Sequence, residues 1–97
     1  MAGNIRMTPD QMEVRAKEYD TQAGAVHDVI TKMDNLLKQL QGEWEGQAAT
    51  AYAQRFADVR PSFVKTEQLI GEIAQALRST AKVMRETDQR LANAYRG

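Results

Sequence analysis

The chain has 97 residues, the size of one domain, and its thirteen basic side chains balance its thirteen acidic ones. Nucleic-acid binding needs a concentrated positive field, which a neutral chain with scattered Lys and Arg lacks, so we exclude nucleic acid as a partner. The absence of Cys excludes disulfides and thiolate metal sites. A metal site would depend on carboxylates and one His, so we predict no metal and no cofactor.

The first eight residues contain no apolar core, so we expect no Sec-type signal peptide. No stretch approaches the roughly 18 apolar residues of a membrane-spanning helix. If the protein leaves the cytoplasm, another route must export it.

The first predicted element is a long helix over residues 8–41. Thr8 has the residue type of an N-cap, Pro9 suits the first helical position, and Gln11 completes a capping box with Thr8. We expect Gly42 to take the left-handed conformation that ends the helix. Apolar residues recur at alternating spacings of four and three, the period of one helical face. This seam comprises Met12, Ala16, Tyr19, Ala23, Val26, Ile30, Met33, Leu37, Leu40 and Trp44.

The second predicted helix covers residues 47–93 and shows the same period. Pro61 lies inside it. Because proline has no N–H and crowds the carbonyl four residues back, we expect a bend near residues 57–61 rather than a break. We expect both chain termini to be flexible. The second seam comprises Ala49, Tyr52, Phe56, Val59, Phe63, Thr66, Ile70, Ile73, Leu77, Thr80, Met84, Thr87, Leu91 and Ala94.

The turn at residues 42–46 is so short that the two helices must be antiparallel neighbours. The predicted fold class is therefore all-α, one helical hairpin over residues 1–97. Apolar residues flank both seams, and a two-helix hairpin has no interior that covers them, so we predict that two hairpins pair into a four-helix-bundle homodimer. The predicted hairpin and dimer seam is Val26, Val29, Ile30, Met33, Leu36, Leu37, Phe56, Phe63, Ile70, Ile73 and Leu77.

The second helix is longer than the first. Counting from the turn places Thr8 opposite roughly residue 80, and the remaining residues would overhang by about 25 Å if helical. This overhang keeps the apolar residues Met84, Leu91 and Tyr95, which one hairpin leaves without packing partners. In an antiparallel dimer each overhang lies near the partner's turn. We therefore hypothesise that the overhang of one chain and Trp44 of the other form one surface.

Two interpretations of Trp44 are open from the residues alone. Its ring either caps the end of the bundle or remains partly exposed for docking, since Trp is a common interface anchor. The flanking Glu43 and Glu45 have no cleft to desolvate them, so we interpret them as solubilising charges. His27 is interpreted as a solvated surface residue. No phosphate loop, nucleophile elbow or dinucleotide fingerprint occurs, so we predict that the protein is not an enzyme.

A chain of about a hundred residues, with Trp-x-Gly at its centre between two amphipathic helices, resembles the WXG family. These proteins are small substrates of the bacterial type VII (Esx) secretion system, related to the mycobacterial early secreted antigen. Trp44 and Gly46 match the defining pair. The resemblance implies a virulence-associated protein that is made in the cytoplasm and secreted as a folded homodimer. It also implies two further partners, the membrane ATPase of the secretion machine and co-secreted helical effectors.

The family carries an export element after its second helix. The strict form, Tyr-x-x-x-Asp/Glu, is absent here, whereas a broader form is met by Met84, Asp88, Leu91 and Tyr95. Their spacings of four, three and four place them on one helical face. The resemblance implies that this tail docks on the export machinery and that the chain is a homodimeric member. On the residues alone, Asp88 could instead pair with a nearby arginine such as Arg85.

Two other functions fit the same residues. One is a membrane-active effector whose wide apolar stripes insert into lipid, although the neutral charge argues against it. The other is a structural coiled-coil adaptor unrelated to secretion, which the heptad-like periodicity explains equally well.

Overall fold

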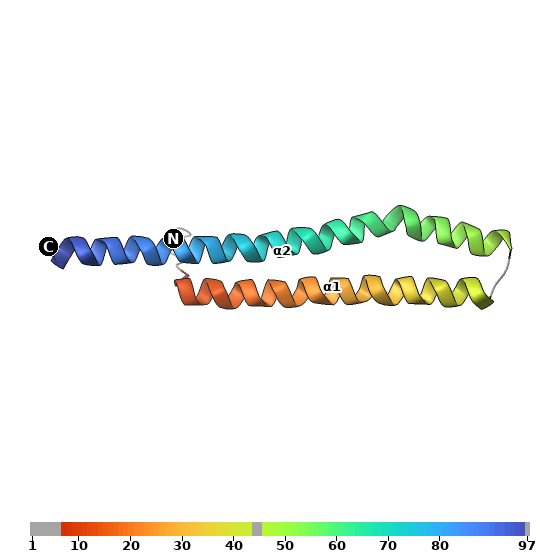
Figure 1. Ribbon diagram of the computed structural model, residues 1–97, viewed down its shortest axis with the longest axis horizontal. Coiled ribbons are helices and arrows are strands. Elements are labelled where there is room, and N and C mark those ends of the chain that lie inside the picture. Colours follow the sequence, from red (N-terminus) through yellow and green to blue (C-terminus); the bar gives the residue numbers. More distant parts are fainter. Residues whose placement is uncertain (1–6, 44–45, 97) are drawn as a thin grey trace, which may run out of the picture.

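The computed structural model describes residues 7–43 and 46–96. Two helices, α1 (Pro9–Glu43) and α2 (Gln47–Arg96), lie side by side and antiparallel in a rod of 77 × 26 × 15 Å (Figure 1). No strand occurs in these two ranges. The predicted all-α hairpin of two long helices is therefore confirmed.

The start of α1 is fixed by a reciprocal pair of hydrogen bonds. The Thr8 backbone N–H donates to Gln11 Oε1 at 2.9 Å, and the Gln11 backbone N–H donates to Thr8 Oγ1 at 3.1 Å. The Met12 N–H donates to the Thr8 carbonyl at 3.0 Å and begins the helical ladder. A helix leaves its first N–H groups without intrahelical partners, and this capping box supplies them.

In the turn, the glycine that has a positive φ is not the one that was expected. Helix α1 continues to Glu43, beyond the expected end at Gln41, and includes Gly42. The positive φ falls instead on Gly46, at +112°. The Gly46 carbonyl then accepts a 3.3 Å hydrogen bond from the Thr50 N–H, the first bond of α2. The glycine of the Trp-x-Gly sequence is therefore needed for its backbone, since L-residues rarely adopt this φ.

Helix α2 passes through Pro61 without a break. It bends where the ribbon is green, around residue 60 (Figure 1). Pro61 has no N–H for the carbonyl four residues earlier, so the helix opens on that side and bends away from it.

The interior between the two helices is built mainly from alanine. Among the described residues the buried apolar side chains are Ala16, Ile30, Ala49, Ala74 and Ala81, and Ala16, Ala74 and Ala81 have no exposed surface. Small side chains let two helices approach closely, but each removes little apolar area from water. Among the described large apolar side chains only Ile30 is buried, and the others are half-buried at the edge of this interior or exposed.

One broad side of the hairpin carries a row of ion pairs between the helices. On α1 the acidic partners Glu13, Asp20 and Asp34 are separated by seven and fourteen residues and therefore share one helical face. They pair with Arg85, Arg78 and Arg60 of α2. His27 and Glu67, 3.2 Å apart, lie in the same row. These groups are largely solvated, so they determine register more than stability.

The pair of Arg60 and Asp34 is bidentate. Arg60 Nε and one of its terminal nitrogens each donate to a different carboxylate oxygen of Asp34, both at 2.9 Å. This two-point hydrogen bond lowers the pKa of Asp34 below its ordinary value. The pair also lies next to the bend, where it holds α2 to α1 across the point at which the helix deviates.

The two glycines of the turn should respond oppositely to alanine. A Cβ at either Gly42 or Gly46 meets no atom within 4 Å, so crowding does not separate them. At Gly46 the positive φ makes Ala strained, and we expect Gly46→Ala to destabilise the fold by about 1–3 kcal/mol. Gly42 is helical, and Gly42→Ala should stabilise by about 0.5–1 kcal/mol. Thermal unfolding followed by circular dichroism measures both, and equal shifts would contradict the assignment.

The pH dependence of the Asp34–Arg60 pair has a definite sign. Because the pKa of Asp34 is lower in the folded state, its contribution is present above its unfolded value and disappears as pH falls through the folded one. Wild type should melt above Asp34→Asn at pH 7, and the difference should vanish between about pH 4 and pH 2. The matched control is Asp28→Asn, an exposed position of α1. A difference between wild type and Asp34→Asn that grows on acidification would contradict this account.

Candidate functional site

The structure divides the predicted seam into two groups. Members such as Ile30, Leu37, Ile70 and Leu77 are buried or half-buried against the neighbouring helix. Val29, Leu36, Phe63 and Ile73 are exposed instead, with 37–61% of their surface accessible. The prediction assigned Phe63 and Ile73 to a combined hairpin and dimer seam, and within one hairpin both side chains are exposed rather than packed on α1. Position 74, not 73, is the one that α1 covers completely.

The exposed members lie on the side of the hairpin opposite the ion pairs. In α1, Val29 precedes the buried Ile30 by one residue, a rotation of about 100° in one direction. Asp34 follows Ile30 by four residues, a rotation of about 40° in the other direction. In α2, Ile73 precedes the buried Ala74 by one residue and Arg78 follows it by four, so the same two rotations apply. We call the resulting surface the apolar face; its exposed members are Tyr19, Val29, Leu36, Tyr52, Val59, Phe63, Leu69 and Ile73.

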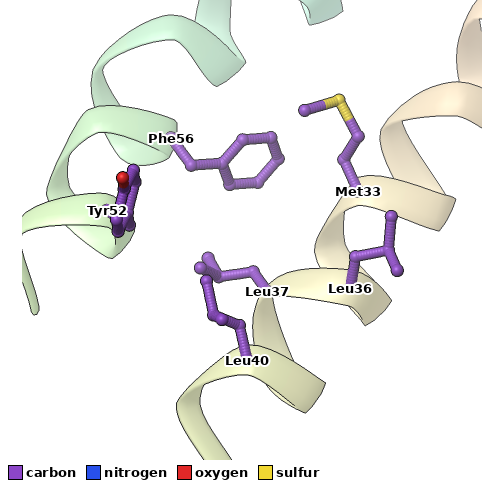
Figure 2. Close-up of a pocket in the computed structure, with 6 residues that line it drawn as sticks. All are labelled: Met33, Leu36, Leu37, Leu40, Tyr52 and Phe56. Atoms are coloured by element: carbon purple, nitrogen blue, oxygen red, sulfur yellow. The ribbon is translucent and has the colours of Figure 1, made fainter. Parts of the chain in front are cut away.

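The apolar face is hollowed near the turn. A shallow pocket of about 210 Å³ lies between the helices, and only apolar or aromatic residues line it. Figure 2 shows Tyr52 and Phe56 of α2 facing Leu37 and Leu40 of α1 across this hollow. Its remaining lining residues are Met33 and Leu36. Apart from the Tyr52 hydroxyl, the side chains that line this hollow offer no hydrogen-bonding group to orient a small polar ligand, and the surface fits the side chains of another helix.

Helix α2 extends beyond the start of α1 at the open end of the hairpin (Figure 1). Arg85 pairs with Asp10 at 2.6 Å and also with Glu13, so it lies level with the first turn of α1. The overhang therefore begins near residue 86, not residue 81, and measures about 16 Å to Arg96. The sequence count gave too long an overhang because it paired the helices about residue 44, whereas the pairs Asp34–Arg60 and Asp10–Arg85 align them about a point near residue 47.

The overhang continues the face of α2 that packs on α1. Asp88 and Tyr95 follow Ala74 and Ala81 at steps of seven residues, and Leu91 follows Met84 in the same way. Met84 is half-buried against α1, whereas Leu91 and Tyr95 are 54% and 90% exposed because α1 has not yet begun. The four predicted tail residues therefore lie on one helical face, of which only the first is covered.

Asp88 has no partner within the described ranges. No hydrogen bond or ion pair to it occurs there, and Arg85, the partner named in the alternative interpretation of Asp88, binds Asp10 and Glu13 instead. The carboxylate is exposed and lies between Met84 and Leu91 on the apolar tail face. It is therefore available to a donor on another molecule. The sequence favoured this role only through the family resemblance, because the sequence does not reveal that Arg85 pairs with two acidic residues of α1.

Trp44 and Glu45 lie outside the described residues. Gly46 is described, and its positive φ directs the chain into α2. Leu69 and Val83, two apolar residues outside the predicted seam of the second helix, are among the exposed large apolar residues. Their three-and-four spacing with Ile73 and Thr80 was the signal that could have identified a second stripe on α2.

Other kinds of site are not indicated in the part of the chain that the structure describes. No group of three or more acidic, His or Cys side chains gathers there in a way that could hold a metal ion. Neither described helix has a stretch apolar enough to cross a membrane.

Comparison with known proteins agrees with this arrangement. Residues 4–89 match the family model WXG100, described as proteins of 100 residues with WXG. Protein YukE of Bacillus subtilis is 34% identical over the full length of both chains. The type VII secretion system extracellular protein A of Staphylococcus aureus is 29% identical over 94% of each chain.

Two solved structures show how similar the fold is. A crystal form of Geobacillus thermodenitrificans EsxA superposes with a TM-score of 0.84 at 34% identity, covering 94% of this chain and all of that one. The secreted protein EsxB of Bacillus anthracis gives a TM-score of 0.81 at 22% identity, covering 88% of this chain and 97% of the other. The hairpin, the central Trp-x-Gly and a match over nearly the whole chain together show that this protein belongs to the WXG100 family of type VII secretion proteins.

Proposed function

We propose that the protein is a secreted substrate and adaptor of a bacterial type VII secretion system. It is made in the cytoplasm, leaves without a Sec-type signal peptide and acts by binding helices rather than by catalysis. The relatives named as extracellular or secreted proteins support the destination. The observation that carries the recognition step is the overhang, an ordered helical face of Met84, Asp88, Leu91 and Tyr95 that α1 leaves largely uncovered.

The tail face suits recognition by a membrane ATPase of the export machine. Leu91 and Tyr95 offer apolar area to a groove, and Asp88, which pairs with none of the described residues, offers a single charge beside them. Apolar contacts supply affinity, and a charge that must find a donor excludes grooves that lack one. Trp44 of the turn is proposed as the second element of the recognition surface, because Trp is the residue type that most often anchors an interface.

The apolar face supports the proposal that the protein is exported as a folded homodimer. Fully burying a Val, Leu, Ile or Phe side chain is worth about 1.5–3 kcal/mol, and the alanine interior of one hairpin gains little of this. The exposed members run along both helices, from Tyr19 to Leu36 on α1 and from Tyr52 to Ile73 on α2. Two copies that pack these faces together form a four-helix bundle. The same helical surfaces could escort co-secreted helical effectors.

The first test of export removes each recognition element in turn. Truncation before Met84 and the variant Trp44→Ala should each abolish appearance of the protein in the medium of intact cells. Helix content by circular dichroism should fall only in proportion to the residues deleted, since the ion pairs of Asp20 and Asp34 remain. Immunoblots of medium and cell fractions measure export. Unchanged secretion of both variants would refute the recognition proposal.

A second test asks which face of the overhang is read. Asp88→Ala and Leu91→Ala change the tail face, whereas Gln89 and Asn93 lie elsewhere on the same helix and bond to each other at 3.2 Å. Secretion should fall sharply for the first two and remain near wild type for Gln89→Ala and Asn93→Ala. All four positions are exposed, so stability should hardly change. Equal losses across the four would mean that the tail acts without a specific face.

A further inference from the structure

The two helices are held together unevenly along the hairpin. Within the described ranges, every ion pair between them involves Arg60 or a residue of α2 that lies farther from the turn. The alanines without exposed surface, Ala16, Ala74 and Ala81, belong to the same part of the hairpin. From Arg60 to the open end, the helices are therefore fastened both by charged pairs and by close packing.

The segment of α2 nearer the turn is fastened less. We call residues 47–60 the turn arm, about 21 Å of helix. In the part of the chain that the structure describes, Arg60 makes the only ion pair of the turn arm with α1, and Ala49 is its only buried side chain. The hollow of about 210 Å³ lies between the turn arm and α1, so Leu37 and Phe56 are only half-buried. Regions with few buried apolar contacts open locally at a lower free energy than the rest of a fold.

Pro61 lies at the boundary between these two parts. Because it has no N–H, the Ala57 carbonyl loses its partner in the helical ladder, and α2 bends here without a break. Around the bend α2 also lies farthest from α1 (Figure 1). A helix that lacks one ladder bond is less stiff at that point, so the turn arm can pivot at Pro61 as an intact helix.

Arg60 and Asp34 join the turn arm to α1 directly beside this pivot. Arg60 precedes Pro61 by one residue and donates two hydrogen bonds of 2.9 Å to the two carboxylate oxygens of Asp34. A bidentate pair fixes both the distance and the orientation of its two groups. This pair therefore determines the angle at which the turn arm lies against α1.

We propose that Pro61 is a hinge and that the Arg60–Asp34 pair is its latch, so that the turn arm opens from α1 while the rest of the hairpin stays paired. Opening uncovers the apolar side chains that line the hollow, among them Leu37 and Phe56. The overhang lies at the opposite end of the rod and is unaffected (Figure 1). The inference concerns motion within one hairpin and is independent of the proposed export function.

The chain has no Cys, so one introduced thiol can report the opening. Ala49 of the turn arm and Ile30 of the paired part are similarly buried, with 6% and 5% of their surface exposed. A buried thiol reacts with a labelling reagent only when its surroundings open. Releasing the latch by Asp34→Asn should raise the labelling rate of Ala49→Cys about two- to fivefold, the range for a partly solvated ion pair, and leave that of Ile30→Cys unchanged.

The matched control removes an ion pair outside the turn arm. Asp20→Asn breaks the pair with Arg78 and should leave the labelling rate of Ala49→Cys near that of the parent. Arg60→Gln removes the other half of the latch and should reproduce the effect of Asp34→Asn. All variants are compared at one protein concentration, so that any association between chains affects them equally.

The hinge is tested by restoring the missing ladder bond. Pro61→Ala supplies an N–H for the Ala57 carbonyl and stiffens α2, so Asp34→Asn should accelerate the labelling of Ala49→Cys much less in this background. An undiminished effect would overturn the hinge. Equal acceleration of Ala49→Cys and Ile30→Cys by Asp34→Asn would show that the hairpin opens as one unit. No acceleration of Ala49→Cys, or the same acceleration by Asp20→Asn, would overturn the latch.

Discussion

The close packing of alanines between α1 and α2 is the constraint on which the rest of this structure depends. Ala16, Ala74 and Ala81 are fully covered, and no bulky side chain could occupy their places without separating the helices. Because the interior is narrow, the larger apolar residues are pushed to one side of the hairpin, and charged pairs border the other. Because small residues fill the interior of the hairpin, many of its large apolar side chains remain exposed and can contact a partner.

The two sides of the hairpin then have different tasks. The ion pairs from Glu13 to Asp34 recur with the heptad and fix how far α1 and α2 slide past each other. This register determines that Arg85 reaches the first turn of α1, and hence where the overhang begins. The apolar face contributes little within one chain and is the part of the molecule that association would stabilise.

The overhang keeps an apolar face because the residue pattern of α2 does not change at the level where α1 begins. Its packing face continues through Asp88, Leu91 and Tyr95 with the same period as the covered part. Where α2 runs alongside α1, this face packs in the hairpin. In the overhang, the same face is available to another protein. One helical stripe would therefore serve both the folding of the hairpin and the proposed recognition by a partner protein.

The sequence alone determined the helices, the capping box at Thr8 and Gln11, the bend at Pro61 and the antiparallel hairpin, because these depend on local periodicity and on a short turn. It also determined the single face of the tail residues. Only the tertiary structure decided which side of each seam is buried, since Phe63 and Ile73 differ from their buried neighbours by one rotation step that periodicity cannot assign. It alone placed the positive φ at Gly46 rather than Gly42, and gave Arg85 to Asp10 and Glu13 rather than to Asp88. Those choices depend on contacts between residues far apart in the chain.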